Sequence, residues 1–129
     1  MSRKILIIDP LLDDKIISSL SEKLEHNGFQ LLTVKDAVSA YKLIENEKIF
    51  FIITALELSD IKGTELCNQL REFNPFYWIC ALTNKKSIFQ ITECLQCGFD
   101  DYLTKPLDID LVLKLTKEAF DRLTRWGIV

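Results

Sequence analysis

The chain has 129 residues, of which 48% are hydrophobic and 27% charged, and its formal net charge is −3. This favours one compact domain over residues 1–129 and excludes a disordered chain, while the absence of a basic block argues against a nucleic-acid interface. The longest apolar runs, 5–8 and 49–53, are too short to span a membrane. No signal peptide is expected, because only four apolar residues follow Lys4 before Asp9. We therefore expect a cytoplasmic protein with protein partners.

Short apolar runs alternate along the chain with segments whose apolar residues recur at helical spacing. The runs have the length of strands buried on both faces, and the segments between them have the period of amphipathic helices. The strands are predicted at 4–8, 30–34, 49–54, 76–82 and 101–103. The helices are predicted at 14–26, from a cap at Asp36 through 46, at 64–73, from a cap at Ser87 through 97 and after a cap at Asp108.

The helical spacing also predicts which side chains face the core. An aromatic run at the start of the fourth strand, Phe76 to Trp78, is expected to be buried, whereas Trp126 is expected in an exposed tail that could dock a partner. The helix residues predicted to face inward are Ile17, Leu20, Leu24, Ala37, Ala40, Ile44, Leu66, Leu70, Ile91, Leu95, Leu111, Leu115 and Ala119.

Five strand–helix pairs in strict alternation predict an α/β fold, with a five-stranded parallel sheet covered by helices on both faces. In such open sheets, functional groups gather outside the carboxyl ends of the strands. The residues at those ends are Asp9 and Pro10, Ala55, Thr83 and Asn84, and the turn at 104–106.

Several motifs at these ends occur together in one known family. The segment F-D-D-Y-L-T-K-P-L at 99–107 follows Gly98, K-I-L-I-I-D occupies 4–9, L-T occupies 82–83, and an L-x-L-x-D-I-x-G loop occupies 56–63. With these motifs the chain resembles, over nearly its whole length, the CheY-like receiver domain of two-component response regulators. The resemblance implies a three-layer sandwich with flavodoxin-like (βα)5 topology, and a non-enzymatic role in bacterial-type phosphorelay signal transduction.

In that family an aspartate at the end of the third strand accepts a phosphoryl group. Magnesium is held by this aspartate and by two acidic residues after the first strand, and its charge offsets the charge on the phosphate. A hydroxyl and a lysine bind the phosphoryl oxygens, and an aromatic residue reports the change. The resemblance assigns the hydroxyl to Thr83, the lysine to Lys105 and the switch aromatic to Tyr102.

The carboxylate positions match only in part. Asp9 matches the first acidic residue, but the second falls on Pro10 and the phosphoacceptor position falls on Ala55. We therefore predict that the usual site does not accept phosphate and that magnesium binding is weak or absent, so no cofactor is expected. The remaining carboxylate of Asp9 is predicted to form an ion pair with Lys105.

Three alternatives stay open at this stage. The phosphoryl group could go instead to Glu57, Asp60 or Thr54. The vacated pocket could bind an anion or another small molecule, because the small Ala55 side chain leaves room beside a cationic lysine. The chain could also be one part of a longer regulator.

The four cysteines, Cys67, Cys80, Cys94 and Cys97, lie in apolar segments rather than in loops. We expect reduced thiols used for packing, with a redox role for the C-x-x-C pair at 94–97 as the lesser alternative. A single such pair does not make up the four ligands of a structural zinc site, so no metal is expected.

The resemblance also implies where partners bind. In the family, the fourth helix, fifth strand and fifth helix form the usual docking or dimer face, which corresponds here to residues 88–95, 102–105 and 108–115. The partners it implies are a second copy of the chain, a histidine kinase or an output protein. A pseudo-receiver that acts through protein–protein interaction is therefore the predicted function.

Overall fold

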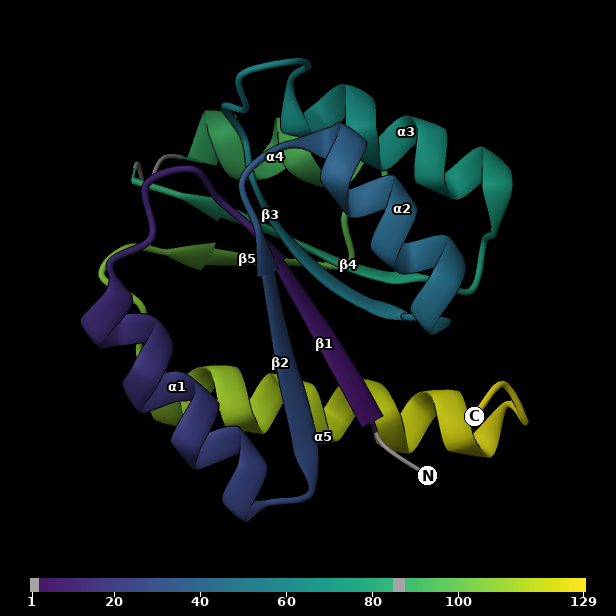
Figure 1. Ribbon diagram of the computed structural model, residues 1–129. Coiled ribbons are helices and arrows are strands. Elements are labelled where there is room, and N and C mark those ends of the chain that lie inside the picture. The colour runs from purple at the N-terminus through teal and green to yellow at the C-terminus, as the bar shows by residue number, and fades with distance from the viewer. Residues whose placement is uncertain (1–2, 85–87) are drawn as a thin grey trace.

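One parallel sheet organises the computed structural model, which describes residues 3–84 and 88–129, with the side chains of 88–90 left aside (Figure 1). Its strands are β1 (Arg3–Ile8), β2 (Phe29–Val34), β3 (Phe51–Ala55), β4 (Trp78–Thr83) and β5 (Asp101–Thr104). Its helices are α1 (Asp14–His26), α2 (Ala37–Glu47), α3 (Gly63–Phe73), α4 (Ile88–Gln96) and α5 (Ile109–Arg125).

The strand order is β2-β1-β3-β4-β5, and every neighbouring pair is parallel. Helices α1 and α5 cover one face of the sheet, and α2, α3 and α4 cover the other (Figure 1). The predicted three-layer α/β fold is thus confirmed. The order reverses between β1 and β3, so the carboxyl ends of these two strands form the crevice where such folds carry their functional groups.

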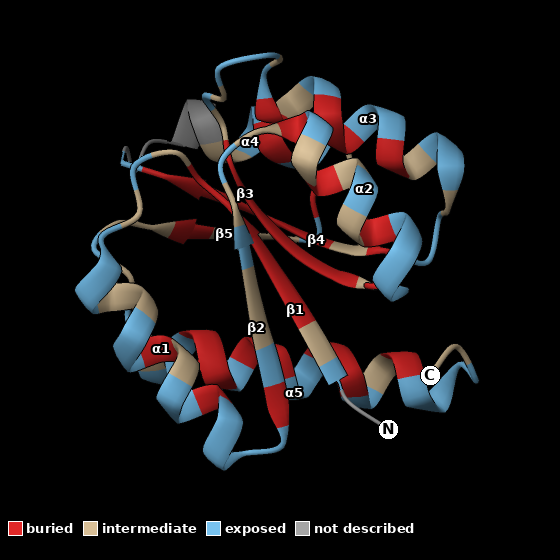
Figure 2. Ribbon diagram, in the orientation of Figure 1, coloured by how far each residue is buried: buried red, intermediate tan, exposed pale blue. Residues whose placement is uncertain are grey.

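Burial of the central strands explains why their sequences are apolar throughout. In β1, Ile5 and Ile7 pack with α1 and α5, whereas Leu6 and Ile8 pack with α2, α3 and α4. All four are fully buried, and Figure 2 shows the same for most of β3 and β4. Among the described residues, no helix is long and apolar enough to cross a membrane.

Aspartates begin three of the helices by accepting hydrogen bonds from backbone N–H groups that lack an intrahelical partner. Asp36 accepts from Ser39 N at 2.8 Å and Asp108 from Leu111 N at 3.2 Å, which confirms both predicted caps. Asp13 caps α1 in the same way. The predicted cap Ser87 lies outside the described residues.

Two strands begin later than predicted. Strand β3 begins at Phe51 rather than at residue 49, and β4 begins at Trp78 rather than at 76, because the two strands pair from Phe51 with Trp78 onward. The Oδ1 of Asn74 accepts a hydrogen bond from the N–H of Phe76, which holds residue 76 in a turn before β4. The same pairing places Ala55 inside β3, opposite Leu82.

Three residues predicted to be buried are exposed. Leu95 is 56% exposed, Leu111 40% and Phe76 45%. In α4 the buried position is Cys94 instead of Leu95, and in the first turn of α5 it is Val112 instead of Leu111. Leu115 and Ala119 of α5 are buried as predicted.

The aromatic residues near the C-terminus form a cluster rather than a free tail. Trp126 is exposed, as predicted, but its ring contacts that of Phe76 with 6.3 Å between the centroids. The guanidinium of Arg122 lies over Trp78 at 4.4 Å and over Trp126 at 5.7 Å. These contacts fix the end of α5 against the turn that precedes β4.

Candidate functional site

The carboxyl ends of four strands bring the predicted site residues together around one cavity. Asp9 follows β1, Ala55 ends β3, Thr83 ends β4 and Lys105 follows β5. The cavity has a volume of about 180 Å³. Its other lining residues are Leu11, Leu56, Glu57, Leu82 and Asn84.

Asp9 is held from three sides. Its backbone N–H donates to the carbonyl of Val34 at 3.0 Å, and its Oδ1 accepts from the N–H of Leu11 at 2.9 Å. Its Oδ2 lies 2.6 Å from the Nζ of Lys105, which confirms the predicted ion pair. Of the two carboxylates that line the described cavity, those of Asp9 and Glu57, the buried one is therefore already paired with a cation of the same protein.

Lys105 is positioned by its own backbone. Its N–H donates to the carbonyl of Thr83 at 2.8 Å, and its peptide bond to Pro106 is cis. Thr83 is buried at the end of β4. The lysine and the hydroxyl residue thus lie at the carboxyl ends of neighbouring strands, beside the same cavity, as the resemblance implied.

The place of Ala55 is fixed by Gly63. The N–H of Gly63 donates to the carbonyl of Leu56 at 2.8 Å, and a Cβ atom at Gly63 would lie 2.2 Å from the carbonyl oxygen of Ala55. Only glycine lets α3 begin this close to the end of β3. The loop between them is closed further by a bridge between Glu57 and Lys62.

Asp60 has a structural role that the sequence did not reveal. Its carboxylate accepts hydrogen bonds from the N–H groups of Ala37 at 3.1 Å, Val38 at 3.0 Å and Ile61 at 3.0 Å. These backbone hydrogen bonds, the one from Ala37 foremost, hold the pKa of Asp60 below its usual value. Asp60 therefore ties the loop after β3 to the first turn of α2.

The three alternative phosphoacceptors lie in different surroundings. Thr54 is fully buried, and its hydroxyl donates to the carbonyl of Ala55 at 3.0 Å. Neither Thr54 nor Asp60 lines the cavity, whereas the exposed Glu57 does. Glu57 is therefore the one alternative acceptor that borders the site.

Tyr102, in β5, does not line the cavity. It is partly buried and packs against the core beneath α2, α3 and α4. Burial, with a smaller contribution from the nearby thiol of Cys94, raises the pKa of its hydroxyl. The position assigned to the switch aromatic thus connects β5 with α4 rather than with the cavity itself.

The carboxylates that line the cavity are those of Asp9 and Glu57. Magnesium prefers oxygen ligands in near-octahedral geometry and is usually held by one or two well-placed carboxylates. Ala55 and Pro10 offer no side-chain donor, Asp9 is paired with Lys105, and Glu57 lies at the rim. Within residues 3–84 and 88–129, no three His, Cys, Asp or Glu side chains gather as a metal site.

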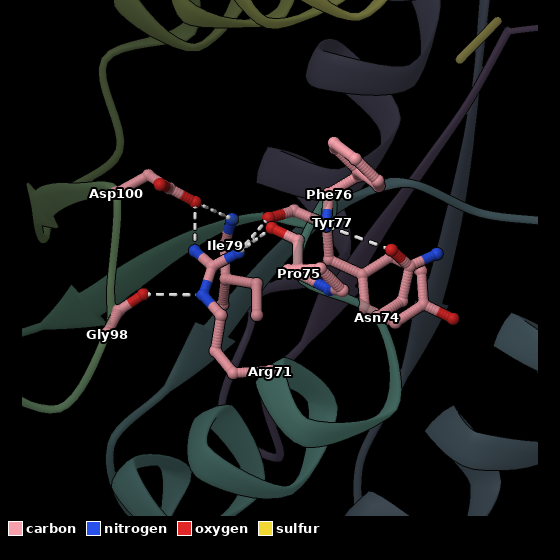
Figure 3. A network of polar contacts seen from close by, with 8 residues as sticks. All are labelled: Arg71, Asn74, Pro75, Phe76, Tyr77, Ile79, Gly98 and Asp100. Carbon is pink, nitrogen blue, oxygen red and sulfur yellow. Dashed lines mark hydrogen bonds and ion pairs between the residues drawn. The ribbon is translucent and has the colours of Figure 1, made fainter.

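A second polar cluster, which the sequence did not predict, lies at the amino end of β4 (Figure 3). The Nε of Arg71 donates to the carbonyl of Gly98 at 2.8 Å, its Nη1 donates to the carbonyls of Pro75 and Tyr77, and its Nη2 pairs with Asp100. The Oδ2 of Asp100 also accepts from the N–H of Ile79 at 2.8 Å. We call these groups the Arg71 cluster; it joins α3, β4 and the turn before β5.

Together, the strand order, the crevice and the convergence of an acid, a hydroxyl residue and a lysine at the strand ends define a CheY-like signalling domain. A family model described as the response regulator receiver domain matches residues 5–117. The chain belongs to this family.

Similar proteins agree with this assignment. The chain is 36% identical over 106 residues to the alkaline phosphatase synthesis transcriptional regulatory protein PhoP of Bacillus subtilis, covering 82% of the chain and 43% of that protein. It is 33% identical over 128 residues to the regulatory protein VanRc of Enterococcus gallinarum, covering 98% of the chain and 54% of that protein. It thus spans about half the length of these relatives.

A solved structure covers the full domain. The crystal structure of a CheY-like response regulator receiver domain protein from Methanospirillum hungatei JF-1 superimposes with a TM-score of 0.83 at 28% identity. The match covers 98% of this chain and 100% of that one.

Proposed function

We propose that this receiver domain takes no phosphoryl group at the end of β3 and acts by binding other proteins. The observation that carries the proposal is the arrangement at the strand ends. Ala55 stands where the family has its acceptor, and Asp9 is paired with Lys105 at 2.6 Å. The fold and the cavity are kept, while the nucleophile and the donors for magnesium are missing.

The charges around the cavity support this proposal. Phosphoryl transfer needs a nucleophilic oxygen and positive charge to offset the charge that develops on the phosphate. Lys105 could supply part of that charge, but its ammonium already contacts the buried carboxylate of Asp9, which offsets most of it. A phosphoryl group would have to share this cation with Asp9, and that lowers the stabilisation it would gain there.

The face formed by α4, β5 and α5 is the proposed docking surface. Leu95 of α4 and Leu111 of α5 are both exposed on these elements, and a bound partner would remove their apolar surface from water. A second copy of the chain, a histidine kinase and an output protein are the proposed partners, because relatives of about twice the length include a transcriptional regulatory protein. The proposed location is the cytoplasm.

A phosphorylation assay tests the proposal directly. The chain is incubated with acetyl phosphate and magnesium, and its intact mass is measured. We expect no added phosphoryl group. The same assay on Glu57→Gln separates the alternatives, because a phosphoryl group that appears on the natural chain and is lost in this variant would place the acceptor at Glu57 and overturn the proposal.

A second candidate function is supported by the cavity itself. Its volume of about 180 Å³ and the side chains of Lys105, Thr83 and Asn84 would suit a small anion. Such a ligand would raise the melting temperature by mass action on the folded state. A thermal-shift screen with inorganic anions and nucleotides, repeated on Lys105→Met, would show a rise only in the natural chain if the anion binds beside the lysine.

A further inference from the structure

Three of the four thiols gather on one side of the sheet. Cys67 in α3 and Cys94 in α4 are buried in the core beneath α2, α3 and α4, and the partly exposed Cys97 packs against the same core. A Cβ atom at Gly98, the residue after Cys97, would lie 3.8 Å from the Sγ of Cys67. Cys80 belongs to the core on the opposite face, so it serves as an internal control.

Cys94 and Cys97 are one helical turn apart. The N–H of Cys97 donates to the carbonyl of Glu93 at 3.0 Å and to that of Cys94 at 3.2 Å, so the backbone between the two cysteines is helical. The dimensions of an α-helix place Cα atoms three residues apart at about 5 Å, within the range of roughly 4.4–6.8 Å found in disulfides. The two thiols are therefore close enough to be joined after a local rearrangement.

We propose that Cys97 and Cys94 form an oxidation site at which a hydroperoxide converts the two thiols into a disulfide. The Cys97 thiolate attacks one peroxide oxygen, the O–O bond breaks, and the products are a Cys97 sulfenic acid and water, or an alcohol if the peroxide is organic. Cys94 then loses its proton, and its thiolate attacks the sulfenic sulfur, whose hydroxyl group takes up that proton. The S–S bond forms, a second water leaves, and the two electrons have passed from sulfur to the peroxide.

Exposure decides the order of these two steps. Oxidants reach thiols according to their accessibility and thiolate character, and Cys97 is the one cysteine in the described chain that is not buried. Burial raises the pKa of Cys94, and it raises the pKa of Cys67 to about 12. Cys97 therefore reacts first, and Cys94 resolves the product.

The new bond would change the end of α4. Cβ atoms three residues apart on a helix are about 5–6 Å apart, whereas a disulfide needs roughly 3.5–4.5 Å, so the last turn must distort to close the bond. Gly98, with φ of +99°, and the hydrogen bond from Phe99 N to Cys94 O at 3.2 Å connect this turn to β5. The oxidation thus reaches the side of the sheet where Tyr102 packs.

The oxidation site itself depends only on the thiols and their surroundings. Its consequence for partner binding rests on the proposed function, because it assumes that the face formed by α4, β5 and α5 is the docking surface. Peroxide treatment followed by mass measurement uses neither a partner nor a phosphodonor. Failure of the oxidation site and failure of the proposed function are therefore seen separately.

The test treats the reduced chain with hydrogen peroxide and measures the intact mass and the tryptic peptide 87–114, which contains both cysteines. We expect a loss of about 2 Da within this one peptide, reversed by dithiothreitol. Cys97→Ser should abolish the loss, and Cys80→Ser should leave it unchanged. Cys94→Ser should leave a Cys97 sulfenic acid that dimedone traps.

Three results would overturn the proposal. One is an unchanged mass at peroxide levels that oxidise a free thiol peptide. Another is a loss of about 2 Da that persists in Cys97→Ser. The third is a disulfide that joins peptide 87–114 to the peptide that contains Cys67. Since Cys97 is partly exposed, Cys97→Ser keeps the test valid even if a substitution at the buried Cys94 disturbs folding.

Discussion

Two ion pairs between an aspartate and a cationic side chain lie at opposite ends of the strands, and their surroundings differ. At the amino end of β4, the guanidinium of Arg71 contacts Asp100 and three backbone carbonyls, and Asp100 also accepts a backbone N–H. At the carboxyl ends, the ammonium of Lys105 contacts Asp9 beside an open cavity. The polar groups around Arg71 and Asp100 are thus joined by hydrogen bonds, whereas the pair of Asp9 and Lys105 borders an open cavity.

The two pairs therefore differ in role: the Arg71 cluster supports the fold, whereas the pair of Asp9 and Lys105 lies at the candidate site. The Arg71 cluster joins three segments that are far apart in sequence, so its loss would affect the whole domain. The pair at Asp9 and Lys105 occupies a site whose frame is held independently, by Gly63 and Asp60. Under the proposed function, the carboxylates of an ordinary receiver are therefore absent without loss of the fold.

The largest effect is expected from Arg71→Ala. This substitution leaves the carboxylate of Asp100 and the carbonyls of Gly98 and Tyr77 without their donor, and we expect the free energy of unfolding to fall by about 3 kcal/mol. Urea unfolding measures it. Arg71→Lys is the matched control, which keeps the charge but not the fork of donors, and should recover less than half of the loss. A loss below about 1 kcal/mol would show that the cluster is not structural.

A smaller loss, of about 2 kcal/mol, is expected from Lys105→Met. Asp9 is only 5% exposed, so its carboxylate would remain buried without a cation. The control is the double variant Asp9→Asn with Lys105→Met, measured in a double-mutant cycle by urea unfolding. It should be more stable than Lys105→Met alone, and equal losses in the two variants would contradict the ion pair.

Restoring a carboxylate at the end of β3 should cost less. In Ala55→Asp the new carboxyl borders the same cavity as Asp9, and repulsion between the two carboxylates raises the pKa of the new group above its unfolded value. The destabilisation should therefore be absent below about pH 4 and reach about 1 kcal/mol as the pH rises to 7. With Pro10→Asp added, millimolar magnesium should reverse the loss, whereas the natural chain should show no response. A loss that is independent of pH would contradict the placement of Ala55 beside Asp9.

The smallest effect on stability is expected from Leu111→Ser. This leucine is exposed on α5, so the free energy of unfolding should change by less than about 0.5 kcal/mol. Leu115→Ser, a buried position on the same helix, is the control and should lose several times more. If Leu111 belongs to a dimer face, the substitution lowers the self-association seen by analytical ultracentrifugation. A large loss of stability would mean that Leu111 is a core residue after all.

Local signals in the sequence were sufficient for most of the fold. The caps Asp36 and Asp108 and the apolar run of β1 act over a few residues, so their patterns predicted the elements that the structure contains. The motif at 99–107 and the count back from Gly63 placed Lys105 and Ala55 at the cavity. These signals work because strand ends in a parallel sheet meet at one edge.

Interactions between distant segments were not predictable in this way. Arg71 meets Gly98 across 27 residues, and Asp60 meets Ala37 across 23, and neither pair has a pattern of its own in the sequence. The exposure of Leu95 and Leu111 depends on how each helix lies against the sheet, which helical spacing alone does not fix. Tertiary contacts decide such details.

The contact between Asp9 and Lys105 also bears on how long a signal lasts. The ammonium is attached to the same chain as the carboxylate, so its local concentration does not vary with the supply of metal or phosphodonor in the cell. In an ordinary receiver, the rate at which the phosphoryl group is hydrolysed sets the lifetime of the active state. Under the proposed function, that lifetime is set instead by the dissociation rate of a bound partner, whose residence time can range from about milliseconds to days.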